Sequence, residues 1–126
     1  MARSALPLIL VDNANILSLL NEGEFKFNAL SFEEAKMIID MHDDDDVIKC
    51  FSGYELKQVV FNYLNVNDRD FKYEPLTEMQ VGQDAITFKI YRTPSETQPV
   101  ITTADGVEAK KIENVYVTCL HFSRLK

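Results

Sequence analysis

Positive charge is scarce in this sequence. Its 126 residues hold 13 Lys and Arg against 20 Asp and Glu, which gives a net charge of −7. A protein that binds double-stranded nucleic acid normally carries a basic face, so this balance argues against that class. Residues 1–63 contain 11 acidic and 5 basic residues, a net of −6, while residues 64–126 contain 9 and 8, a net of −1. We therefore expect any anion-binding site to draw on the second half or on backbone amides.

Cysteines, long apolar runs and signature motifs are also few. Cys50 and Cys119 have no metal-binding spacing and lie in strand-like runs, which predicts buried, reduced thiols. The N-terminal apolar run stops at Asp12, too short for a signal peptide or a membrane span, so we expect a cytoplasmic protein without membrane contact. The aspartates at 43–46 lack the glycine turn of a hard-cation loop and indicate a solvated acidic loop. No phosphate-binding glycine loop, serine triad or dinucleotide fingerprint occurs, and we expect neither a metal nor a cofactor.

The length and the 46% apolar fraction predict one globular domain, residues 1–126. We assign it to the α/β (α+β) class, with a mixed central β-sheet of about five to six strands and two main helices packed on it. The predicted strands are 8–11, 24–28, 47–51, 71–73, 85–92 and 115–122, with a hairpin in 100–109 about Asp105-Gly106. The predicted helices are 32–41 and 54–64, preceded by a short apolar segment at 16–20.

Strand 85–92 is the most strongly specified element. Turn residues Gly82, Gln83 and Asp84 precede it, and Pro94 follows it. Alternation places one set of side chains on the buried side and a second set on the other side. The first set is Ile86, Phe88 and Ile90, and the second is Ala85, Thr87, Lys89 and Tyr91. Arg92 falls in register with the buried side, where it either reaches solvent or binds an anion at the mouth of a cleft.

Both predicted helices have a recognisable start. Ser31 and Glu34 have the spacing of a capping box, ahead of an apolar stripe. That stripe consists of Phe32, Ala35, Ile38 and Ile39. Ser52, Gly53 and Tyr54 join strand 47–51 to helix 54–64, and the free amides of such a junction can bind a phosphate without a lysine. Ordinary capping by Ser52 explains the same residues.

Several segments, in order, resemble the viral ring nucleases that act as anti-CRISPR proteins against type III systems. The segments are LVDNANILSLL, GEFKFNALSFEEAK, the junction at residues 52–54, GQDAITFKIYR and IENVYVTCLHFSRL. The resemblance implies a compact α/β homodimer that binds cyclic tetra-adenylate across its interface. It also implies metal-independent cleavage, in which a ribose 2′-hydroxyl attacks the adjacent phosphate and a histidine protonates the departing 5′ oxygen.

Carried over to this sequence, the resemblance makes Arg92 the ligand-binding arginine, Glu96 the nearby acid and Asn13 the N-terminal asparagine. Tyr54 occupies the position of the family's histidine, beside Ser52 and Gly53. An unperturbed tyrosine, with a pKa of about 10, is poorly matched to acid catalysis near pH 7. The spacing from Arg92 to Glu96 is also one residue longer than the family pattern. Tyr54 can still stack on an adenine or donate to a phosphate.

The resemblance implies a viral or mobile-element protein in the host cytoplasm that sequesters or slowly cleaves a cyclic oligonucleotide. A second hypothesis is a non-enzymatic inhibitor, whose acidic residues 43–46 mimic nucleic acid and bind a host defence or transcription protein. A third hypothesis replaces the missing histidine by His42 or His121. His121 shares a strand face with Val115 and Val117, a position more typical of a structural histidine.

Overall fold

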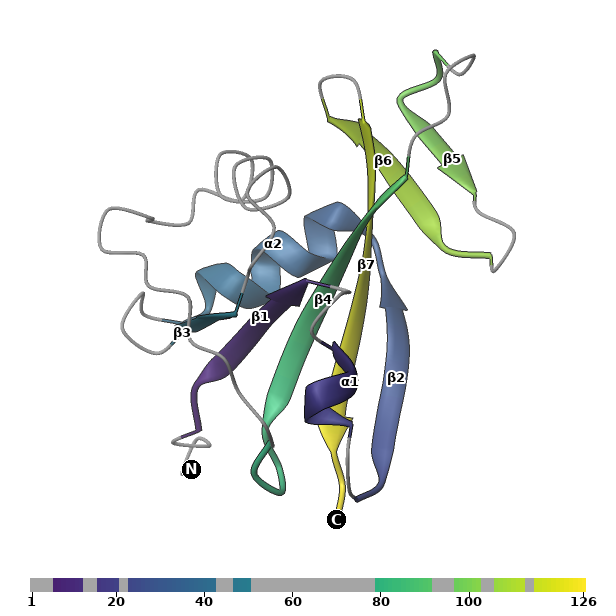
Figure 1. Ribbon diagram of the computed structural model, residues 1–126. Coiled ribbons are helices and arrows are strands. Elements are labelled where there is room, and N and C mark those ends of the chain that lie inside the picture. Colours follow the sequence, from purple (N-terminus) through teal and green to yellow (C-terminus); the bar gives the residue numbers. More distant parts are fainter. Residues whose placement is uncertain are drawn as a thin grey trace.

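The computed structural model describes residues 6–12, 16–20, 23–42, 47–50, 79–91, 97–102, 106–112 and 115–126. Its elements are β1 (Leu8–Asp12), α1 (Ile16–Leu19), β2 (Phe25–Leu30), α2 (Phe32–Asp40), β3 (Val47–Cys50), β4 (Asp84–Tyr91), β5 (Val100–Thr102), β6 (Glu108–Ile112) and β7 (Val115–Arg124). Figure 1 traces them along the chain. The predicted helix at 54–64 and the predicted strand at 71–73 lie outside the described residues.

All the described strands join one mixed sheet, which confirms the predicted fold class. The order is β3-β1-β4-β7-β6-β5, and β2 also pairs with β7. β1 is parallel to both β3 and β4, while the other pairings are antiparallel. The described part of the sheet has seven strands, against the predicted five to six, because the β5–β6 hairpin contributes two.

β7 connects the parts of this sheet. One of its edges pairs with β4 from Tyr116 to Ser123. Its other edge pairs first with β6, over Val115–Thr118, and then with β2, over Cys119–Arg124. The sheet therefore depends on β7 more than on β4, the strand that the sequence specifies most strongly.

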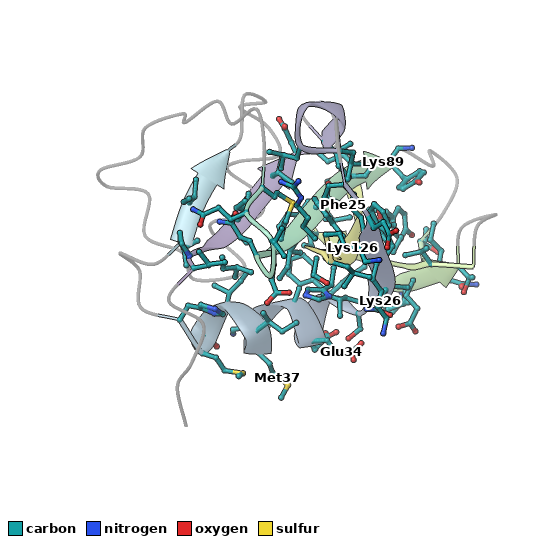
Figure 2. All side chains as sticks on the ribbon, turned by 90° about the horizontal axis from the view of Figure 1, so that it is seen from below. Phe25, Lys26, Glu34, Met37, Lys89 and Lys126 are labelled. Atoms are coloured by element: carbon teal, nitrogen blue, oxygen red, sulfur yellow. The ribbon has the colours of Figure 1, made fainter. Side chains whose placement is uncertain are left out.

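The two helices that the structure describes cover opposite faces of the sheet. α2 packs on the face formed by Leu8, Leu10, Ile86, Phe88, Val117 and Cys119, which we call the α2 face. The other side, here the α1 face, includes Ile9, Val11, Ala85 and Phe122, and Leu19 of α1 packs there. In Figure 2, α2 lies on one side of the sheet and α1 on the other. β1 is buried throughout, as the continuous apolar run predicts.

The capping box of α2 is confirmed. The Glu34 amide donates to Ser31 Oγ over 3.1 Å, and the Ser31 amide donates to Glu34 Oε1 over 2.9 Å. Phe32, Ala35 and Ile39 are buried, so the predicted stripe faces the sheet. The helix ends at Asp40, one residue before the predicted boundary.

β4 begins at Asp84, one residue before its predicted start, and Gly82 precedes it with a φ of 87°. The predicted last residue, Arg92, lies outside the described residues. The sequence predicted that only one side of this strand is buried, and that prediction was incomplete. Ala85 and Thr87 are also buried, because the second side of the strand is covered as well. Phe122 and Leu19 belong to the cluster that covers Ala85.

The end of the sheet near Gly23, Gln83 and the last residues of β7 is here called the foot of the sheet. Backbone and side-chain hydrogen bonds hold it in place. Gly23, with a φ of 109°, precedes β2. The Glu24 amide donates to the Lys126 carbonyl, and Arg124 Nε donates to the same oxygen. The buried side chain of Gln83 accepts from the Gln80 amide and donates to the Pro7 carbonyl, each over 3.0 Å. This end of the molecule is therefore fixed by specific polar contacts.

Candidate functional site

The carboxyl ends of three neighbouring parallel strands define the candidate site. β1 lies between β3 and β4 and is parallel to both, so the carboxyl ends of all three strands lie at the same edge of the sheet. β3 and β4 follow β1 in sequence but lie on opposite sides of it. Such a reversal of strand order leaves a crevice outside the carboxyl ends, where open α/β sheets bind ligands. We call this edge the carboxyl edge of the sheet.

The three strands do not end at the same height. Cys50 pairs with Val11 and Phe88 pairs with Asp12, so β3 and β1 end close together. β4 continues from Phe88 to Tyr91, and those three further residues rise by about 10 Å along the strand. Over the described residues, the carboxyl edge is therefore a step, with β4 and its partner β7 forming the taller side.

The predicted site residues follow these three strand ends in sequence. Asn13 comes directly after β1, and Arg92 comes directly after β4. Ser52, Gly53 and Tyr54 come two to four residues after β3, at positions 52–54 following Cys50. Together with Glu96, all six lie outside the described residues, so their side-chain geometry stays a prediction.

Asp12 is a residue of this edge that lies one position beyond the predicted strand 8–11. It is instead the last residue of β1 and is only 4% exposed. Alternation puts it on the α2 face, with Leu8 and Leu10. The apolar run Leu8–Val11 was the sequence signal that could have placed Asp12 in the strand, because β1 continues from that run through Asp12.

Lys89 and Tyr91 occupy the part of β4 that extends beyond β1. Alternation from Ala85 places both on the α1 face, and the ammonium of Lys89 lies 4.9 Å from the centre of the Tyr91 ring. Lys89 is exposed and Tyr91 is half-buried. The described residues therefore place a cation and an aromatic ring on the taller side of the step.

Neither histidine lies at the top of this edge. His121 pairs with Ile86, five residues before the end of β4 at Tyr91, or about 16 Å along the strand. Its Nε2 lies 3.2 Å from Asp84 Oδ1, which connects β7 to the start of β4. His42 Nδ1 lies 2.9 Å from the Ile38 carbonyl at the end of α2. These contacts agree with the structural interpretation of His121.

The described thiol is buried and forms no disulfide, in agreement with the predicted buried, reduced state. Cys119 is free and buried in the α2-face core. Burial raises the pKa of its thiol to about 12, and the negative charge of Glu33 adds to that increase. The side chain of Cys50 lies outside the described residues.

The described part of the chain holds neither a cluster of metal ligands nor a membrane-spanning helix. Within it, no three His, Cys, Asp or Glu side chains gather closely enough to hold a metal ion. None of the helices described here has the length and apolar character needed to cross a bilayer.

Comparison with known proteins finds a similarity in structure and none in sequence. No protein-family model and no curated protein matches the sequence. Among solved structures, the chain is similar to B116 of Sulfolobus turreted icosahedral virus, with a TM-score of 0.60. The match covers 94% of this chain and 99% of the viral chain, at 11% sequence identity. The two proteins therefore share a fold over nearly their whole lengths.

Proposed function

We propose that this chain is a viral or mobile-element protein that counters host defence by binding a cyclic oligonucleotide second messenger, such as cyclic tetra-adenylate. The observation that carries the proposal is the arrangement of β3, β1 and β4, whose carboxyl ends form one stepped edge at a reversal of strand order. Open sheets bind ligands at such an edge. The fold shared with a protein of an archaeal virus supports a viral origin.

The chemistry expected at this edge suits a phosphodiester. In the proposal, amides at residues 52–54 and the guanidinium of Arg92 bind the phosphates, while Asn13 contacts the ligand from the end of β1. Tyr54 stacks on a base or donates to a phosphate. Two copies in a symmetric homodimer would match a ligand of the same symmetry, and the protein would act in the host cytoplasm.

Cleavage, where it occurs, needs no metal in this proposal. The 2′-hydroxyl gives up its proton as its oxygen forms a bond to the adjacent phosphorus, the bond from phosphorus to the 5′ oxygen breaks, and that oxygen takes up a proton. Glu96 and Tyr54 are the residues assigned to proton transfer. Because tyrosine is a weak acid near neutral pH, we expect slow turnover and a protein that acts mainly by sequestration.

The test is to incubate the purified protein, in EDTA, with cyclic di-, tri-, tetra- and hexanucleotides. A ligand at 100 times its Kd stabilises the folded protein by about 2.7 kcal/mol, which a thermal shift detects readily. Mass spectrometry of the same samples separates cleavage from sequestration. Arg92→Ala should abolish the shift, whereas Lys36→Ala, on the exposed side of α2, should leave it unchanged.

The absence of both a shift and products with every ligand would refute the proposal. The acidic inhibitor would then be the hypothesis to pursue, through neutralisation of Asp43 to Asp46. A shift that survives Arg92→Ala would keep the function but overturn the assignment of that arginine.

A further inference from the structure

The acidic side chains on the described strands all lie on one face of the sheet. The acidic residues, Asp12, Asp84 and Glu108, all fall on the α2 face. Each lies two or four positions along its strand from a core residue of that face, namely Leu10, Ile86 or Ile112. The charged residues on the α1 face are Lys89, Lys111 and Arg124, which are all cationic. In a protein with a net charge of −7, one side of the sheet is thus free of acids over its described strands.

Two of these cations lie on the tall side of the carboxyl edge. Lys111 of β6 pairs with Tyr116 of β7, which in turn pairs with Tyr91 of β4. Lys111 is therefore two strands from Tyr91, about 10 Å across the sheet, and Lys89 is two residues below Tyr91. In Figure 2, Lys89 lies on the side of the sheet away from α2 and from its labelled residues Glu34 and Met37.

Two other cations on the described strands are already engaged. Arg124 donates to the carbonyls of Met79 and Lys126, and Lys110 on the α2 face pairs with Glu33 over 2.5 Å. Lys89 and Lys111 form no ion pair with any described carboxylate; Lys89 rests over the Tyr91 ring instead. Within the described residues, neither charge is therefore neutralised by a carboxylate.

A buried hydroxyl lies on the same side, next to Lys89 on its strand. Thr87 is 3% exposed, and its Oγ1 has no hydrogen-bond partner in the part of the chain that the structure describes. A buried, unsatisfied hydroxyl costs about 1–3 kcal/mol, so such groups are uncommon in folded proteins. Thr87 therefore adds, within the described residues, an unsatisfied polar group to the α1 face of β4, which also carries Lys89.

We propose that Lys89 and Lys111, with the ring of Tyr91 beside Lys89, form a phosphate-binding subsite on the α1 face for a single-stranded oligonucleotide. The two ammonium groups bind successive phosphates, and a base stacks on Tyr91, as in other single-strand sites that combine cations with aromatic rings. The inference rests on the proposed function in one respect, because it extends the ligand from the carboxyl edge over the taller strands β4, β7 and β6.

The experiment compares two double variants that carry the same net charge. Lys89→Ala/Lys111→Ala removes the subsite, while Lys26→Ala/Lys36→Ala removes two cations from the side that bears α2. The probes are cyclic tetra-adenylate and linear, single-stranded tetra-adenylate, measured by calorimetry at several salt concentrations. Circular dichroism confirms that each variant is folded.

We expect the subsite variant to bind about 100-fold more weakly, because a charge-assisted hydrogen bond contributes about tenfold for each lysine. Its slope of log K against log salt should become shallower by about 0.7 for each phosphate that a lysine no longer neutralises. The α2-side variant should bind like the wild type.

Equal loss in the two variants, or no loss in either, would overturn the subsite and leave the proposed function standing. Binding of the linear probe alone, weakened only by the subsite variant, would support the subsite and refute the cyclic ligand. Failure of the wild type to bind either probe would overturn both.

Discussion

The replacement of Gly23 by alanine should destabilise the protein far more than the same change at Gly82. Both glycines have a positive φ, 109° and 87°, which costs an L-residue about 1–2 kcal/mol. At Gly23, a Cβ would also lie 2.4 Å from the Lys126 carbonyl oxygen and 2.8 Å from Arg124 Nε, whereas at Gly82 it would have no atom within 4 Å. The two sites therefore differ mainly in the steric clash that a Cβ would make at Gly23 and would not make at Gly82.

The magnitude follows from the contacts that must move. The Lys126 carbonyl accepts from the Glu24 amide over 3.2 Å and from Arg124 Nε over 2.9 Å. The loss of each hydrogen bond costs about 0.5–1.5 kcal/mol. With the backbone strain, Gly23→Ala should lower the free energy of unfolding by about 2–5 kcal/mol, and Gly82→Ala by about 1–2 kcal/mol.

Urea unfolding followed by circular dichroism measures both variants. With a slope of about 1.5 kcal/mol per molar urea, the midpoint of Gly23→Ala should fall by about 1–3 M. Equal losses in the two variants would mean that the Lys126 carbonyl moves aside freely, and would refute the view that these contacts fix the foot of the sheet.

Three other predictions concern stability. Ser31→Ala removes the acceptor for the Glu34 amide and should cost about 1 kcal/mol in urea unfolding, whereas Lys36→Ala should be near neutral. Gln83→Ala leaves the Pro7 carbonyl and the Gln80 amide without their partner and should cost about 2–4 kcal/mol; a loss below about 1 kcal/mol, measured by thermal denaturation, would contradict that role. Because burial raises the pKa of Cys119 from 9.0 to about 12, the unfolded state loses this proton first, and the thiol's contribution to stability should fall as pH rises from 9 to 12. Unfolding of Cys119→Ala across that range should lack this component of the decline.

Local sequence signals predicted the elements that they encode directly. The capping box located α2, the turn at Gly82 located β4, and the alternation of Val115–Phe122 located most of β7. Gly106, with a φ of 82°, belongs to the hairpin predicted about Asp105-Gly106, although β6 extends to Ile112. Each signal lies within about ten residues of its element, which is why it can be read from the sequence.

The pairing partners could not be predicted in this way. β2 pairs with β7, so that Phe27 stacks on Phe122 with ring centres 5.2 Å apart, although 94 residues separate them in sequence. The burial of Thr87 depends on elements that cover a second side of β4. For the candidate site, the sequence identified residues that follow the strand ends, but only the topology brings those ends to one edge. The absence of acids from the α1 face of the described strands likewise follows only from the register of the sheet.

The position of β7 has a consequence for how this protein folds. Every described part of the sheet, β1 with β3 and β4, β2, and the β5–β6 hairpin, meets the others through this strand, which follows them all in sequence. During synthesis, the edges of β4, β6 and β2 that pair with β7 therefore stay unpaired until β7 has been made. Unpaired strand edges are sites of aggregation, and non-local pairing slows folding. We therefore expect nascent chains of this protein to depend on chaperones until the residues of β7 have emerged.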